Sequence, residues 1–187
     1  MSEQAKTRQR PADVYFFATC VVDQFFPGAG MDAITLLEKH GIRVHFPEEQ
    51  TCCGQPAYTS GLPDEARKVA AHQLTLFPND WPVVVPSGSC AGMMKHHYPT
   101  LFAADPQSKA KAEALSARIY EFTDFLVNVL GWQPEDKGGD CTVVLHTSCS
   151  ARREMGVHLT GRKLLGGLDK VTVAMQDHES ECCGFGG

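Results

Sequence analysis

Short apolar runs alternate with helix-like patterns along the first two thirds of this chain. Residues 14–18 form a continuous apolar run of the kind that a buried parallel strand shows, and residues 43–46 and 81–85 are predicted as the second and third strands. Apolar side chains at helical spacing predict helices between and after these runs, over residues 32–40, 62–77, 91–98 and 107–130. Strand, helix and strand in succession predict parallel strands joined by right-handed crossovers.

The same pattern starts again after a polar, glycine-rich stretch at residues 133–140. A strand is expected over residues 142–145, a helical stretch interrupted by Gly156 and Gly161 over 151–168, and a second strand over 170–175. We therefore predict an α/β fold with two pseudo-repeated halves, each built from a short parallel sheet flanked by helices. The first half spans residues 11–132. The second, residues 140–187, ends before a third strand and is expected to be truncated.

Composition and charge exclude several classes of protein. The 187 residues are 43% hydrophobic and 21% charged, as in an ordinary soluble globular protein. The net charge is −5 and the basic residues are scattered, which argues against a nucleic-acid partner. No apolar stretch has the length of a signal sequence or a membrane span, so we expect a cytoplasmic protein. In that reducing compartment, a disulfide framework is the weaker account of eight cysteines.

Six of the eight cysteines form two copies of one pattern, a single cysteine after an apolar strand followed by Cys-Cys-Gly. The first copy consists of Cys20, Cys52, Cys53 and Gly54, and the second of Cys149, Cys182, Cys183 and Gly184. The single cysteine and the pair are separated by 31 residues in the first copy and by 32 in the second. This repeated spacing indicates a metal or iron–sulfur protein.

The predicted topology brings distant cysteines together. Ligands of parallel sheets lie beyond the carboxyl ends of the strands, and Cys20, Cys52, Cys53 and Cys90 each follow such an end. Thiolates are soft ligands that suit iron–sulfur clusters or zinc. Adjacent cysteines suit two metals of one cluster better than one tetrahedral ion. A glycine after them, such as Gly54, can adopt positive φ and donate its N–H to a sulfur.

Several motifs carry a resemblance to a known family. They are Thr19-Cys20-Val21-Val22-Asp23, Gln50-Thr51-Cys52-Cys53-Gly54-Gln55-Pro56-Ala57-Tyr58, Pro86-Ser87-Gly88-Ser89-Cys90 and Glu181-Cys182-Cys183-Gly184-Phe185-Gly186-Gly187. The chain resembles the cysteine-rich Cys-Cys-Gly iron–sulfur proteins from about Ala12 to its last residue. Within that family it is most similar to the lactate-utilisation A group, which is related to the cysteine-rich component of heterodisulfide reductase and to the iron–sulfur component of glycolate oxidase.

The resemblance implies a function and partners. It implies an iron–sulfur electron-transfer subunit of an oxidoreductase complex that oxidises L-lactate to pyruvate, without independent activity. The other subunits of the complex would include a ferredoxin-like iron–sulfur subunit. No residue of this chain has the appearance of the base that removes the lactate proton.

The family pattern also implies which cysteines are cluster ligands, and this chain departs from that pattern at two places. Cys20, Cys52, Cys53 and Cys90 correspond to cluster ligands at a first site, as do Cys149, Cys182 and Cys183 at a second. Ser87 occupies the first position of the family's Cys-x-x-Cys, which favours an ordinary [4Fe-4S] or smaller cluster there. The Cys-x-x-Cys of the second site would lie beyond Gly187. With three thiolates, the second site could hold zinc, a degraded cluster or nothing.

Two other functions remain open. A heterodisulfide or thiol–disulfide reductase component would use the same kind of cluster to cleave a disulfide. A zinc-stabilised, non-catalytic binding module would use the cysteines only for structure, although the spacing of Cys52 and Cys53 is not that of a zinc ribbon. Zinc could also replace a cluster lost in air. Outside the repeat, Cys141 is expected to pack in the interior, and Arg152 could hold an anion or lie on a solvated helix face.

Overall fold

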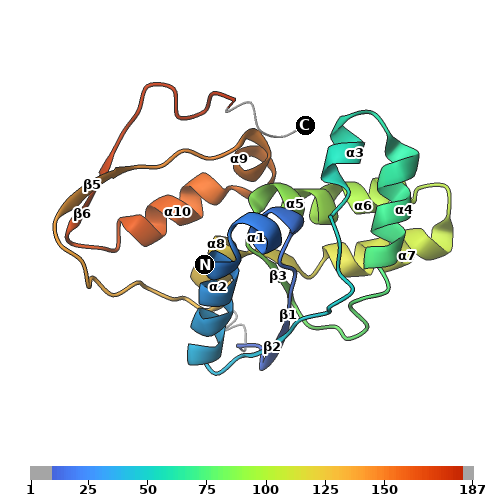
Figure 1. Cartoon of the computed structure of the whole chain (residues 1–187), viewed down its shortest axis with the longest axis horizontal. Coiled ribbons are helices and arrows are strands. Elements are labelled where there is room, and N and C mark those ends of the chain that lie inside the picture. Colours follow the sequence, from blue (N-terminus) through green and yellow to red (C-terminus); the bar gives the residue numbers. More distant parts are fainter. Residues whose placement is uncertain (1–9, 183–187) are drawn as a thin grey trace, which may run out of the picture.

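The computed structural model describes residues 10–182, and its first half is built on a four-stranded parallel sheet (Figure 1). The strands are β1 (Asp13–Phe16), β2 (Arg43–His45), β3 (Val83–Val85) and β4 (Ile119–Glu121). Their order across the sheet is β2-β1-β3-β4. Tyr15 is in register with His45 of β2 on one side and with Val83 of β3 on the other.

Helices cover both faces of this sheet. They are α1 (Cys20–Phe25), α2 (Pro27–Lys39), α3 (Gln55–Thr59), α4 (Pro63–Gln73), α5 (Gly88–Gly92), α6 (Tyr98–Leu101), α7 (Pro106–Ser116) and α8 (Phe122–Asp124), with π-helical turns η1 (Met93–His97) and η2 (Phe125–Val129). Side chains alternate along β1, so Tyr15 and Phe17 enter the core under α4, α6 and α7, while Val14 and Phe16 enter the core under α2 and η2. The central strands β1 and β3 are buried on both faces of the sheet, which explains why they contain apolar runs, whereas the edge strand β2 is partly exposed and carries Arg43 and His45.

The prediction of one long helix over residues 107–130 is wrong. The segment instead contains α7, the strand β4 and the short turns α8 and η2. Ile119 of β4 pairs with Val83 and is fully buried, so pairing with the sheet edge overrides the helical pattern of the flanking sequence. Glu121 then caps α8, because its carboxylate accepts hydrogen bonds from the backbone N–H groups of Thr123 and Asp124.

The second half contains a smaller parallel sheet of two strands, β5 (Cys141–Val144) and β6 (Val171–Ala174), connected through α9 (Cys149–Met155) and α10 (Val157–Leu165). Gly156 adopts φ 65 and separates the two helices, as expected, whereas Gly161 lies within α10 and does not interrupt it. The predicted class of fold, short parallel sheets flanked by helices, is confirmed.

The two halves meet where α5 packs on α9 (Figure 1). Gly88 of α5 faces Ala151 of α9 so closely that a Cβ added at Gly88 would overlap the Ala151 side chain and lie 2.8 Å from its Cα. Glu154 of α9 lies over Gly92, and its carboxylate is 3.1 Å from Nε2 of His97. Between residues 10 and 182, none of the helices has both the length and the apolar character needed to cross a membrane.

Candidate metal centre

The candidate centre lies at the carboxyl ends of the three adjacent strands β2, β1 and β3. Cys20 is the first residue of α1 after β1, Cys52 and Cys53 end the loop that follows β2, and Cys90 lies in α5 after β3. The chain leaves β1 for β2 on one side and later reaches β3 on the other side of β1. The centre therefore lies at the point where the strand order reverses, which is where open parallel sheets form ligand crevices.

The four thiols interact in a row. Cys20 hydrogen-bonds with Cys52, Cys52 with Cys53, and Cys53 with Cys90. The structure thus brings together the four first-half cysteines that the strand ends predict. Cys53 and Cys90 are buried, while Cys20 and Cys52 are half-buried and reach the surface.

Hydrogen bonds and burial shift the pKa values of the four thiols in different directions. A hydrogen bond from the Cys53 thiol lowers the pKa of Cys52 to about 5, helped by the N–H of Gly54 and opposed by burial. The same hydrogen bond raises the pKa of Cys53 far above its ordinary value. The pKa of Cys90 is lowered by its hydrogen bond with Cys53 and further by the hydroxyls of Ser87 and Ser89. The pKa of Cys20 is raised by burial and by the charge of Cys52.

Gly54 has the backbone conformation that the Cys-Cys-Gly motif predicts. Its φ is 86, and its N–H donates to Sγ of Cys52 at 3.4 Å. A Cβ at this position would lie 3.3 Å from the carbonyl oxygen of Ala66, so the turn also fits closely against α4. Gly54 therefore places a backbone donor on a sulfur, which tunes a thiolate or its metal. The corresponding Gly184 lies outside the described residues.

Thr19, directly before Cys20, holds a strained backbone. Its φ is 65, and among residues 10–182 it is the only residue other than glycine with positive φ. A β-branched residue in this conformation costs about 1–3 kcal/mol, and such strain is found at functional sites. The Thr19 hydroxyl caps α1 by accepting the N–H of Val22 at 3.3 Å. Backbone strain and cap together fix the direction in which Cys20 leaves the sheet.

Two glutamines hold the loop carrying Cys52 and Cys53, and the sequence assigned neither of them a role. Gln50 hydrogen-bonds to the backbone of β1 and its continuation, accepting from Ala18 N and donating to Phe16 O. Gln73 of α4 is fully buried and donates to the Thr51 hydroxyl at 2.7 Å. Contacts of this kind leave no periodic pattern in the amino-acid sequence, so only the folded structure reveals them.

Buried polar contacts also hold the deeper cysteines. The hydroxyl of Tyr98, a fully buried side chain, donates to the carbonyl oxygen of Cys53 at 2.9 Å. Ser87, where the resemblance implies a cysteine, supplies a hydroxyl hydrogen bond to Cys90. At this position the chain therefore offers a donor to a sulfur instead of another sulfur.

The donor set fits a soft metal in its chemistry. Four thiols on converging strand ends, one with a pKa near 5, match thiolate-bound iron–sulfur groups or zinc. Throughout the described part of the chain, however, no group of three or more His, Cys, Asp or Glu side chains is arranged to hold a metal ion. Holding a cluster would therefore require the thiols to lose their protons and change their arrangement.

The second copy of the pattern is only partly described. Cys149 begins α9 and Cys182 is exposed, whereas Cys183 lies outside the described residues. The segment before Cys182 returns to the start of α9, because Nε2 of His146 lies 3.2 Å from the carbonyl oxygen of Glu181. The same end of the β5–β6 sheet thus receives Cys149 and the segment that leads to Cys182.

Other sequence candidates have structural partners. Glu179, a buried carboxylate, bridges Arg152 at 2.6 Å and Arg162, and these ion pairs lower its pKa despite the opposing effect of desolvation. Arg152 is therefore engaged in holding the segment before Cys182 against α9. Cys141 is exposed, so its expected packing role is wrong.

Comparisons with known proteins agree with this layout. The sequence profile of the family described as "Cysteine-rich domain", CCG, matches residues 14–95 and 143–187, which contain the two copies of the pattern. The chain is 45% identical over 177 residues to lactate utilization protein A 1 of Bacillus mycoides, covering 93% of this chain and 71% of that protein. It is 42% identical to lactate utilization protein A of Shouchella clausii, covering 94% and 73% of the two chains. It is 43% identical to the protein of that name from a Geobacillus strain, with 93% and 73% covered.

Proposed function

This chain belongs to the cysteine-rich CCG domain family and, within it, to the lactate utilization protein A group, and we propose that it carries electrons through an iron–sulfur group in lactate utilization. The group would be held by Cys20, Cys52, Cys53 and Cys90. By resemblance, the overall reaction is oxidation of L-lactate to pyruvate. The chain would act beside partner subunits that include a ferredoxin-like iron–sulfur protein.

One observation carries the proposal. Four cysteines separated by up to 70 positions in the sequence have their thiols in one row at the strand-order reversal of the sheet. Packing alone does not explain two adjacent cysteines followed by a glycine at φ 86 whose N–H reaches a sulfur. A bound iron–sulfur group supplies one-electron chemistry at a potential set by such hydrogen bonds.

The residues of the chain prepare this centre in distinct ways. Cys52 offers a thiolate at neutral pH because its pKa is about 5. Gly54 keeps a donor directed at that sulfur, and Tyr98 anchors the backbone of Cys53 in the core. Ser87 and Ser89 donate to Cys90 and so favour its thiolate form. Together these contacts allow deprotonated sulfur to persist where burial alone would oppose it.

The test is metal analysis of protein purified without air. We expect iron and acid-labile sulfide in the wild type, an EPR signal on reduction, and loss of the first-half iron in Cys53→Ser. Cys141→Ser is the matched control, because Cys141 is an exposed cysteine outside both patterns. A colourless wild-type protein without iron or sulfide would contradict the proposal. Stoichiometric zinc with no spectral change on reduction would identify a structural zinc module instead.

The same experiment addresses the second pattern. If Cys149, Cys182 and Cys183 also hold iron, Cys149→Ser lowers the iron content while leaving the first-half signal in place. If they hold none, Cys149→Ser leaves both iron and sulfide unchanged. The iron lost from each variant thus separates the two sites.

Thiol–disulfide chemistry is a second candidate, favoured by the pair Cys20 and Cys52. A half-buried thiolate with a pKa near 5, hydrogen-bonded to a neighbouring thiol, resembles an attacking thiol beside a resolving one. Attack of the Cys52 thiolate on a disulfide would release one thiolate and form a mixed disulfide. The Cys20 thiolate would then release the second thiol and leave a Cys20–Cys52 disulfide. Catalytic reduction of a disulfide by metal-free protein with dithiothreitol, lost in Cys20→Ser, would favour this candidate.

A further inference from the structure

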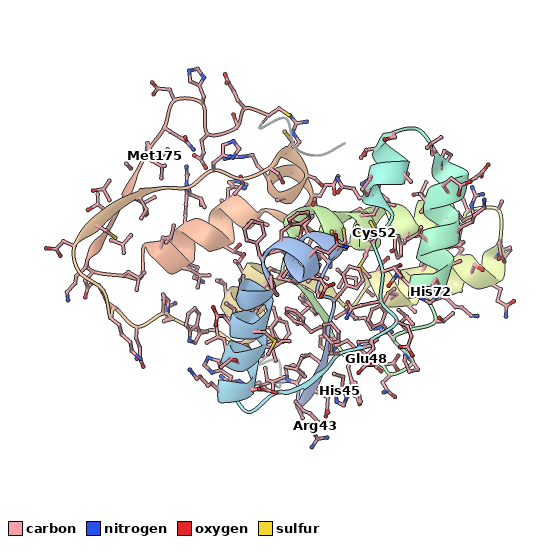
Figure 2. All side chains as sticks on the ribbon, viewed as in Figure 1. Arg43, His45, Glu48, Cys52, His72 and Met175 are labelled. Atoms are coloured by element: carbon pink, nitrogen blue, oxygen red, sulfur yellow. The ribbon has the colours of Figure 1, made fainter. Side chains whose placement is uncertain are left out.

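The surface beside Cys20 and Cys52 has a cleft that the proposed centre does not itself explain. Its volume is ≈380 Å³, and its lining includes Cys20, Cys52, Asp23, Glu48 and Phe46. It therefore lies directly over the two cysteines of the row that reach the surface. Figure 2 shows Glu48 and Cys52 along the same segment between β2 and α3.

This face is acidic. Two segments form it, residues 18–26 and 46–53. Together they carry Asp23, Glu48 and Glu49 and contain no lysine, arginine or histidine, and the imidazole that lies against them is His72 of α4, whose Nε2 is 2.8 Å from the carbonyl oxygen of Glu49. A small carboxylate such as a 2-hydroxy acid would be repelled here. The cleft is therefore suited to a cationic group.

Large apolar side chains are exposed on the same two segments. Phe25 is 70% exposed, Phe26 62% and Phe46 44%. Phe25 and Phe26 follow directly on the α1 residues that line the cleft, and Phe46 lines it. Exposed aromatic side chains beside charged ones are typical of a protein–protein interface with an apolar centre and a polar rim.

We propose that residues 18–26 and 46–53 form the docking face for a basic protein partner, which covers Phe25 and Phe46 and places lysine or arginine side chains against Asp23, Glu48 and Glu49. A second copy of this face would repel the first, because both carry the same three acidic groups. An anionic membrane surface would be repelled for the same reason. That the partner exchanges electrons rests on the proposed function, whereas the docking face does not.

The test uses cytochrome c, a basic electron-transfer protein, as the probe. Binding to the metal-free full chain is measured by calorimetry at about 10 mM and about 150 mM ionic strength. We expect binding at low ionic strength that weakens with salt. The triple variant Asp23→Asn, Glu48→Gln, Glu49→Gln should bind about tenfold more weakly. It loses three ion pairs at the rim of the interface, and each such pair contributes only modestly to binding.

The matched control neutralises three acids elsewhere, Glu65→Gln, Glu113→Gln and Glu135→Gln, and so makes the same change in net charge. Its binding should stay within about twofold of wild type. Absence of binding by the wild type, or equal weakening in both triple variants, would overturn the proposal. So would self-association of the wild type that the cleft variant abolishes, because the occupant would then be a second copy. Metal-free protein keeps this result independent of iron content, which is measured separately.

Discussion

Gln50 continues the edge of the sheet beside Ala18: its Oε1 accepts the N–H of Ala18 at 2.9 Å, and its Nε2 donates to the carbonyl oxygen of Phe16 at 3.3 Å. Pairing of β2 with β1 ends at Tyr15 and His45, so this side chain continues the hydrogen bonding after the strand has stopped. The contact attaches the loop carrying Cys52 to the end of β1 that leads to Cys20.

Replacing Gln50 by alanine should therefore loosen this loop. The N–H of Ala18, a buried residue, would lose its acceptor, so we expect a loss of roughly 1–3 kcal/mol in the free energy of unfolding. Urea denaturation measures it. Gln24→Ala is the control, since Gln24 is an exposed glutamine on α1 that lines the same cleft. Equal stability of the two variants would show that the Gln50 contact does not hold the loop.

The lowered pKa of Cys52 predicts how its reactivity depends on pH. Because the thiolate is the nucleophile and the pKa is about 5, alkylation of Cys52 in metal-free protein should rise through about pH 5 and level off by about pH 7. An unstructured cysteine peptide keeps rising through about pH 8.5. Iodoacetamide labelling followed by mass spectrometry gives both profiles. Cys53→Ala removes the principal donor to Cys52 and should shift the midpoint upward; an unchanged midpoint would contradict the hydrogen-bonded pair.

Gly54 should tolerate alanine less well than another glycine of similar conformation. Gly54 and Gly61 have φ 86 and 77, so alanine is strained at both positions. A Cβ at Gly61 meets nothing within 4 Å, whereas at Gly54 it lies 3.3 Å from the Ala66 carbonyl oxygen. We expect a loss of about 1 kcal/mol for Gly61→Ala and roughly 2–3 kcal/mol for Gly54→Ala, measured by urea denaturation. A cost at Gly54 no larger than at Gly61 would argue against the close fit with α4.

Gly88 should be intolerant of any side chain because of its contact with α9. Gly88→Ala places a methyl group on Ala151, and overpacking of this kind costs about 1–3 kcal/mol. Gly28 lies in α2 with open space around it, so Gly28→Ala should be neutral or stabilising by up to about 1 kcal/mol. Limited proteolysis of the 133–140 stretch, followed with time, shows whether the halves separate. If residues 133–140 were cleaved no faster in Gly88→Ala than in Gly28→Ala, the tight contact between Gly88 and α9 would be contradicted.

The sequence indicated the strands other than β4, and the convergence of the first-half cysteines, because both depend on patterns that a sequence records. Val83–Val85 is an apolar run because it is buried on both faces, and Cys90 follows it at a strand end. The repeated Cys-Cys-Gly spacing then identified which residues to bring together, and the positive φ of Gly54 followed from glycine's freedom from a Cβ.

What the sequence did not indicate depends on single contacts across the fold. The strand β4 was hidden within a helical pattern, because its strand conformation comes from pairing with β3. Thr19 has positive φ, which its residue type gives no reason to expect. The bridge from Glu179 to Arg152 and Arg162 joins residues of ordinary surface type, so only their placement reveals it.

The strand order β2-β1-β3-β4 also bears on when the centre can form during synthesis. Cys20 and Cys90 become neighbours only once β3 has paired with β1, and β3 is not complete before Val85. A nascent chain that exposes Cys20, Cys52 and Cys53 has three thiols but lacks the sheet edge that brings the fourth to them. If the four cysteines hold the proposed iron–sulfur group, its assembly at the full set would therefore follow folding of the first half and would take place on a folded surface.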